Sequence, residues 1–345
     1  MQYRDDQWRE SGELDQRNVR EVKHGRRKPA RLGRALLLGL LIVVLVAGGV
    51  LLIRHGRAEA AGQKEPEKPG ETTENLFVPD PSVPAAELPE GWEYRIMEAA
   101  ALQEGTLVLV NADYGYDAEL PRTVSVYDNK TGNYLVKDIY LSLDPTAMTQ
   151  LNAWMDAFAA ESGKRDVNIV AGWRSYDDQT AIYRNAVETK GQAHADAYIA
   201  LPGHSEHHTG LALDLDTYDL SSGTSGGFDG DGAYTWAVDH AWEFGFIQRY
   251  PPAKSDITGI DYESWHFRYV GLPHSYIMST KNLCLEEYIE LLRQHPDTAE
   301  HLTCTCQGKT YELYYSPGPA VPVPTDRTYT VSGNNVDGYV ITIEN

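Results

Sequence analysis

Hydrophobic positions form one continuous run near the N-terminus of the chain and short periodic segments further on. Residues 35–53 hold only Leu, Ile, Val, Ala and Gly, nineteen residues without a charge. A helix rises about 1.5 Å per residue, so this run nearly spans a hydrocarbon core of about 30 Å. The pattern predicts a single transmembrane helix.

The residues on either side of the apolar run indicate its orientation. A cleaved signal peptide is the alternative, because the small residues Ala58, Ala60 and Ala61 would permit cleavage. The apolar part of a signal peptide is usually shorter than this run, which favours an uncleaved anchor. Eight Lys or Arg residues lie between Arg17 and Arg34, and few follow the run. The positive-inside rule therefore predicts a cytoplasmic N-terminus, with the rest of the chain outside the cell membrane.

Composition and periodicity divide the remainder of the chain. Residues 54–90 are rich in Ala, Glu, Lys, Pro and Thr and lack periodic apolar spacing, which is typical of a flexible extracytoplasmic linker. We therefore expect a basic cytoplasmic tail over 1–34, a globular domain over 91–300 and a C-terminal extension over 301–345. The final stretch "TYTVSGNNVDGYVITI" predicts a strand pair around a turn rich in Gly and Asn.

Apolar spacing within the globular domain predicts a mixture of helices and strands. Asp144 can cap a helix that begins at Pro145. Ser175, with Asp178 in capping-box position, can cap a second helix. This second helix would end near Val187, and further helical spacing covers 233–245 and 283–295. Strands are predicted at 105–111, around Val124, at 167–171 and at 265–271. Helices and strands do not alternate regularly, so we predict an α+β domain with a mostly antiparallel sheet and flanking helices.

The distribution of charge excludes one class of partner. The chain has a formal net charge of −20, although residues 1–34 hold ten Lys or Arg against six Asp or Glu. The part after the apolar run is therefore strongly acidic, and an acidic surface repels polyanions. Nucleic acid is not expected as a partner, and we interpret the acidity as a contribution to solubility.

Three cysteines, Cys284, Cys304 and Cys306, all lie late in the chain. One disulfide and one free thiol would be compatible with an extracytoplasmic location. Cys284 could pair with either of the other two, because a bond between residues two apart would be strained. A Cys-x-Cys metal site is the alternative, but the chain holds no further cysteine to complete it.

The segment "SEHHTGLALDLD", from Ser205 to Asp216, contains side chains that bind metals. His207 and Asp214 lie seven positions apart, about 10 Å along a straight helix and on opposite faces of a straight strand. One zinc ion could hold both only if the chain bends between them, and Gly210 can supply that bend. Beyond the bend, Asp214 would face a site, while the opposite strand face, directed at the core, would carry Leu211, Leu213 and Leu215.

The segment "ESWHFRYVG", from Glu263 to Gly271, can complete the same site. Strand alternation places His266 opposite the apolar side chains Trp265, Phe267 and Tyr269, so His266 can be a third ligand. Two His and one carboxylate form a catalytic type of zinc set that leaves a position for water. Glu263 could act as general base, and Arg174, at a strand-to-helix junction, could stabilise a developing oxyanion.

These segments resemble the VanY-type D-alanyl-D-alanine carboxypeptidases, which are related to the D-Ala-D-Ala dipeptidases and to the hedgehog fold. The pattern SxHxxGxAxD is met from Ser205 to Asp214 and ExWH from Glu263 to His266, and the resemblance covers roughly residues 91–300. It implies a hedgehog-like α+β fold with zinc on an antiparallel sheet. The implied roles are zinc ligation by His207, Asp214 and His266, general base catalysis by Glu263, transition-state stabilisation by Arg174, and substrate binding by Gln179 and Ser205.

The resemblance also implies a reaction: hydrolysis of the C-terminal D-Ala of peptidoglycan stem peptides, at the outer side of the cell membrane. The alternatives are an L,D-carboxypeptidase acting on tetrapeptide stems, or a zinc-containing module that binds peptidoglycan without catalysis. Glu263 and Arg174 favour an enzyme, because a binding module needs neither a base nor an oxyanion partner. His204, His208 and Asp216, beside the expected ligands, are expected to have structural or supporting roles. No role in the site is expected for His194, His240, His274 and His301.

Overall fold

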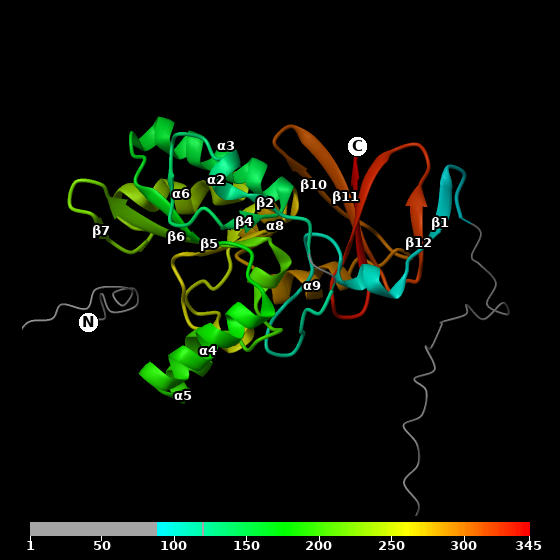
Figure 1. Cartoon of the computed structure of the whole chain (residues 1–345). Coiled ribbons are helices and arrows are strands. Elements are labelled where there is room, and N and C mark those ends of the chain that lie inside the picture. Colours follow the sequence, from blue (N-terminus) through cyan, green and yellow to red (C-terminus); the bar gives the residue numbers. More distant parts are fainter. Residues whose placement is uncertain (1–87, 119–120) are drawn as a thin grey trace, which may run out of the picture. The chain divides into compact units, whose positions relative to one another are not determined.

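The computed structural model describes residues 88–118 and 121–345 (Figure 1). They belong to one compact unit of the chain, Ala86–Asn345. The predicted tail, the predicted transmembrane helix and nearly all of the predicted linker lie outside the described residues. None of the helices within the described ranges is long and apolar enough to cross a membrane.

A mixed sheet at the centre of the unit carries the segments singled out above. Its strands stand in the order β3-β5-β6-β9-β8, and β7 pairs with β6. Only β3 and β5 are parallel, and the other neighbours in this sheet are antiparallel. The predicted α+β class with a mostly antiparallel sheet is confirmed. The strands are β3 Leu135–Val136, β5 Val167–Ala171, β6 Ala212–Asp219, β7 Thr224–Ser225, β8 Phe246–Gln248 and β9 His266–Tyr269.

Helix α3, Pro145–Ser162, covers one face of this sheet (Figure 1). It begins as predicted, because the Asp144 carboxylate accepts hydrogen bonds from the backbone N–H groups of Thr146 and Ala147. Trp154 is fully buried against the sheet, with ring centroids 5.2 Å from Phe246 and 4.9 Å from Phe267. This contact joins the helix to the strands beneath it. The same core holds Met148, Leu151, Met155, Phe158, Leu211, Leu213 and Leu215.

The other helices surround the sheet. Ser175 caps α4, but the Asp178 carboxylate accepts its bond from the Ser175 hydroxyl, so the predicted capping box is only half formed. The predicted helical segment that ends at Gly245 consists of a short α-helix flanked by two 3₁₀ turns. The helices are α2 Val126–Asn129, α4 Tyr176–Lys190, α5 Gln192–Tyr198, α6 Thr235–His240, α7 Ser255–Thr258, α8 His274–Lys281 and α9 Leu285–Arg293, and the 3₁₀ turns are η1 Ala99–Gln103, η2 Glu206–Thr209, η3 Gly232–Tyr234 and η4 Ala241–Phe244.

The C-terminal strands form a second antiparallel sheet in the order β10-β11-β14-β13. The predicted terminal strand pair is confirmed as β13 and β14. Strand β12 pairs with β1, the first described strand, and the two lie side by side in Figure 1. The bounds are β1 Trp92–Ile96, β10 Leu302–Cys306, β11 Lys309–Ser316, β12 Ala320–Pro324, β13 Thr328–Gly333 and β14 Tyr339–Glu344, with β2 Val124–Ser125 and β4 Ser142–Leu143 as a separate short pair.

The predicted strand over 105–111 is wrong. Leu107 and Val110 are fully buried, as their apolar character suggested, but the segment joins no sheet. Its polar backbone groups bond largely to side chains. The Ser332 hydroxyl accepts from the Leu107 N–H, and the carbonyls accept from Arg268 and Asn335. Buried backbone needs partners, and here side chains supply what a neighbouring strand would otherwise provide.

All three cysteines are free thiols in the structure. The disulfide considered from the sequence is therefore not formed. The only group of three or more His, Cys, Asp or Glu side chains arranged for a metal within the described ranges contains no cysteine, so the Cys-x-Cys alternative is not supported either.

Candidate metal centre and active site

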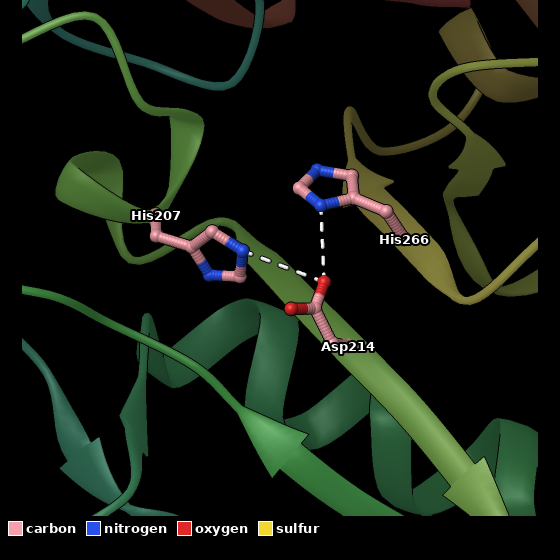
Figure 2. Close-up of side chains that lie close together, drawn as sticks. All are labelled: His207, Asp214 and His266. Carbon is pink, nitrogen blue, oxygen red and sulfur yellow. Dashed lines mark ion pairs between the residues drawn. The ribbon is translucent and has the colours of Figure 1, made fainter. Parts of the chain in front are cut away.

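His207, Asp214 and His266 converge in the structure, as predicted (Figure 2). One ligand atom from each lies within 4.8 Å of the others, and all three residues are buried. His207 Nε2 is 3.4 Å and His266 Nδ1 is 3.0 Å from Asp214 Oδ1. Figure 2 shows the two imidazoles directed at the Asp214 carboxylate.

Local backbone geometry explains how residues seven apart in the chain meet. His207 lies on η2, which ends at Gly210 in a left-handed conformation with φ 73°. The chain turns there and continues as β6, where Asp214 stands directly opposite His266 of β9. Cross-strand neighbours of this kind have Cβ atoms about 5 Å apart, so one strand pair supplies two of the three candidate ligands. The bend expected at Gly210 is confirmed.

Hydrogen bonds at the far nitrogens orient both imidazoles. His207 Nδ1 is 2.7 Å from the Gly172 carbonyl, which can only accept, so Nδ1 carries the proton and Nε2 presents a lone pair. His266 Nε2 lies 3.4 Å from Glu206 Oε2, which leaves Nδ1 facing the cluster. Asp214 Oδ1 is buried and accepts no hydrogen bond from the described residues. Three donor atoms thus face one point, and two imidazoles with one carboxylate fit a catalytic zinc site.

The protonation states also suit a metal centre. Burial lowers the pKa of His207 to about 4, so this imidazole is neutral near pH 7. Burial would raise the pKa of Asp214, but His207 and His266 hold it well below its usual range. Burial would likewise lower the pKa of His266, but Asp214 and Glu206 outweigh it and raise the pKa to about 9. Metal binding at neutral pH must therefore displace a proton from His266.

Glu263 lies beside the cluster without belonging to it. Its carboxylate is buried, and Oε2 is 3.7 Å from His266 Nδ1. Its backbone N–H donates to the Tyr250 carbonyl, which anchors the residue just before β9. Burial raises the pKa of Glu263 to about 8 in the metal-free site. A carboxylate with a raised pKa at this position suits proton transfer.

Arg174 approaches the cluster from the end of β5. Its Nη2 is 4.0 Å from Asp214 Oδ2, and its Nη1 donates to Gln179 Oε1 at 2.7 Å. The backbone N–H of Arg174 donates to the His207 carbonyl at 3.1 Å, which ties this segment to η2. Gly172, two residues earlier, leaves no room for a side chain, because a Cβ there would lie 2.5 Å from the Ser142 carbonyl oxygen.

The other residues predicted near the site make contacts within the protein. Gln179 is buried and donates Nε2 to the Ala200 carbonyl at 2.6 Å, so both ends of its amide are engaged. Ser205 is buried directly before η2. His208 is not in the cluster, as expected, but its Nδ1 donates to the Arg174 carbonyl at 2.8 Å. Asp216 accepts from the Thr217 N–H and from the Ser225 hydroxyl, in agreement with a structural role.

A cavity of about 600 Å³ adjoins Arg174. Trp173, Arg174 and Tyr176 line one part of it. Another part is lined by residues 115–118, a segment whose contribution no sequence pattern indicated. The Tyr116 N–H donates to the Gly203 carbonyl at 2.7 Å, so this segment is held close to the loop that precedes η2. The cavity is large enough for part of a peptide, and Arg174 lines it, whereas none of the three clustered residues does.

The described chain is similar to enzymes that act on D-Ala-D-Ala. The family model VanY, D-alanyl-D-alanine carboxypeptidase, matches residues 140–272. A D-alanyl-D-alanine carboxypeptidase of Enterococcus faecium is 34% identical over 264 residues, covering 74% of this chain and 80% of that protein. The bifunctional D-Ala-D-Ala dipeptidase and D-Ala-D-Ala carboxypeptidase VanXYC of Enterococcus gallinarum is 36% identical over 159 residues, covering 46% and 81%.

A solved structure shows the same similarity in three dimensions. The vancomycin resistance D,D-dipeptidase VanXYg, crystallised with a D-Ala-D-Ala phosphinate analogue, matches with a TM-score of 0.65 at 31% identity. The match covers 74% of this chain and 99% of that one. Fold and relatives together define a peptidase. The chain belongs to the VanY family of D-alanyl-D-alanine carboxypeptidases, which confirms the resemblance seen in the sequence.

Proposed function

We propose that this enzyme is a zinc-dependent D,D-carboxypeptidase that removes the C-terminal D-Ala from peptidoglycan stem peptides. The relatives support the reaction and the substrate class. The observation that carries the zinc assignment is the convergence of His207 Nε2, Asp214 Oδ1 and His266 Nδ1, with the far nitrogens of both imidazoles engaged elsewhere. Zinc held by this set would act as a Lewis acid and would acidify a water toward neutral pH.

The chain's own residues would move the proton and stabilise charge. Glu263 accepts the proton of the attacking water at its carboxylate and then delivers a proton to the amine of the departing D-Ala. Arg174 donates hydrogen bonds to the oxygen that gains negative charge as the peptide carbonyl is attacked. Both side chains lie within about 4 Å of the proposed ligands, at 3.7 Å for Glu263 to His266 and 4.0 Å for Arg174 to Asp214.

The substrate would extend from this centre into the neighbouring cavity. Arg174 lines the cavity and also lies 4.0 Å from Asp214, so a substrate bound in the cavity could reach the proposed metal centre beside Arg174. Of the two residues expected to bind substrate, Gln179 would act through Arg174, because its amide is engaged on both sides. Ser205 is buried and does not line the cavity, so only the family pattern supports a role for it in substrate binding.

The deciding experiment uses synthetic stem pentapeptide, purified protein and zinc, with the products followed by mass spectrometry. Release of one D-Ala from the pentapeptide supports the proposal. Cleavage of the tetrapeptide alone would show L,D specificity. Intact pentapeptide and tetrapeptide in the presence of zinc-loaded protein would indicate a module that binds peptidoglycan without catalysis.

The proposed location is the outer face of the cell membrane, with the N-terminus in the cytoplasm. The apolar run over 35–53, the basic residues before it and the polar linker over 54–90 support this arrangement. Protease added to intact protoplasts should digest the part of the chain after residue 90. Complete protection of that part, with digestion only after lysis, would contradict the proposed topology.

A further inference from the structure

A buried network of four charged side chains lies behind the proposed metal ligand His266. The side chains of Glu206, Arg249 and Arg268 have an exposed fraction of 0%, and that of Glu286 on α9 is exposed to only 13%. Burying ionised groups is costly unless they are paired and hydrogen-bonded. Two guanidinium groups and two carboxylates balance here, so all four can remain charged.

The two oxygens of Glu206 make different contacts. Oε1 accepts hydrogen bonds from Arg249 Nε and from Arg268 Nη1, both at 2.8 Å. Oε2 faces His266 Nε2 at 3.4 Å. The two arginines therefore hold the carboxylate by one oxygen and leave the other for the imidazole.

The arginines are themselves fixed from further away. Arg268 Nη2 donates to the carbonyls of Thr106 and Val108, at 3.0 and 2.9 Å. Arg249 makes a bidentate pair with Glu286, at 3.0 and 2.6 Å. These contacts restrain the position of Glu206 relative to β9, which carries His266.

We infer that Glu206 is a positioning residue that selects the metal-binding tautomer of His266. By accepting the Nε2 proton, it leaves the Nδ1 lone pair directed at the cluster. This inference rests on the proposed role of His266 as a ligand. The neighbouring ligand His207 is oriented by a neutral carbonyl, whereas His266 has a carboxylate, which makes the imidazole a stronger electron donor.

A competing arrangement makes such selection necessary. His266 Nδ1 is only 3.0 Å from Asp214 Oδ1. With the proton on Nδ1, the two ligand side chains would bond to each other and neither atom would be free for a metal. Glu206 disfavours that tautomer, because its carboxylate accepts a hydrogen bond from a protonated Nε2 and has no proton to donate to a bare Nε2 lone pair.

The variant Glu206→Gln tests this role. Its amide oxygen would turn toward Arg249 and Arg268, which can only donate, so its NH₂ group would face His266 Nε2. That contact favours the proton on Nδ1, the arrangement that excludes the metal. We expect the pH-independent zinc affinity of the full-length chain, obtained from chelator competition at several pH values so that proton competition at His266 is separated out, to fall about 10- to 100-fold. The control Glu286→Gln disturbs the same network without contacting His266, and its zinc affinity should stay within about threefold of wild type.

The outcomes separate this inference from the proposed zinc site. Wild-type protein that binds no zinc would refute the site itself. Wild-type affinity in Glu206→Gln, or an equal loss in both variants, would refute only the positioning role. If Glu206→Gln does not fold, Glu206→Asp decides: it keeps the charge but shortens the reach to His266, and unchanged zinc affinity would overturn the inference. In zinc-loaded wild type, ¹⁵N NMR should show the His266 proton on Nε2; a proton on Nδ1 would refute both His266 Nδ1 as a ligand atom and the inference that rests on it.

Discussion

Glu263→Gln should abolish most of the hydrolysis while the protein keeps its zinc. The change preserves the size of the side chain and removes the group that accepts a proton. Glu263 Oε2 lies 3.7 Å from His266 Nδ1, but Glu263 is not one of the three clustered ligands. General acid/base catalysis is commonly worth about a hundred- to ten-thousand-fold, or about 3–5 kcal/mol of activation free energy. We expect kcat to fall by that factor and KM to change much less.

The assay combines steady-state kinetics on stem pentapeptide with zinc analysis of the same preparation. Asp216→Asn is the matched control, because Asp216 is a buried carboxylate on the same face of β6 as Asp214 whose oxygens accept from Thr217 and Ser225. It should retain turnover within about tenfold of wild type. If Glu263→Gln lost its zinc or kept more than about a tenth of wild-type turnover, the base would have to be sought elsewhere, with Asp216 first.

Three further predictions follow from the same geometry. Arg174→Ala should lower kcat by about two to three orders of magnitude. Gln179→Ala removes the side chain that accepts a 2.7 Å hydrogen bond from Arg174, and it should lower kcat less. Equal losses of kcat in the two variants would contradict an indirect role for Gln179. Zinc uptake by metal-free protein should release at least one proton near pH 7, because the pKa of His266 is raised to about 9 and that of Glu263 to about 8. Apparent affinity should then rise at least about tenfold per pH unit from pH 6 to 8 in calorimetry, and a pH-independent affinity would contradict this. Gly210→Ala should destabilise the fold by about 1–2 kcal/mol in denaturant titrations, because φ is 73° and the new Cβ would lie 3.1 Å from Thr123 Cγ2; an unchanged midpoint would contradict the need for glycine.

Local patterns predicted much of the site. The helix that starts at Pro145 and the turn at Gly210 depend on a capping side chain and on a left-handed backbone, both of which are properties of a few adjacent residues. Strand alternation correctly placed Leu213 in the core and Asp214 on the opposite face, because side chains of a strand alternate regardless of what it pairs with. Together with family spacing, this was sufficient to predict which three side chains cluster, and their role as zinc ligands stays a proposal.

Partners distant in the chain could not be predicted in the same way. The segment 105–111 has the apolar character of a strand, but its backbone bonds to Arg268 and Asn335, more than 150 residues further along the chain. Glu206 occupies an unspecified position of the motif SxHxxGxAxD. Its partners Arg249 and Arg268 lie 43 and 62 residues away, so nothing near Glu206 showed that a carboxylate there would be buried and paired.

Anomalous diffraction at the zinc edge, from crystals of zinc-loaded protein, tests the proposed metal centre most directly. One peak should lie about 2.0–2.2 Å from His207 Nε2, from the Asp214 carboxylate and from His266 Nδ1, with Glu263 outside bonding distance. A peak coordinated by other residues, or none at this cluster in protein that hydrolyses the pentapeptide, would contradict the account.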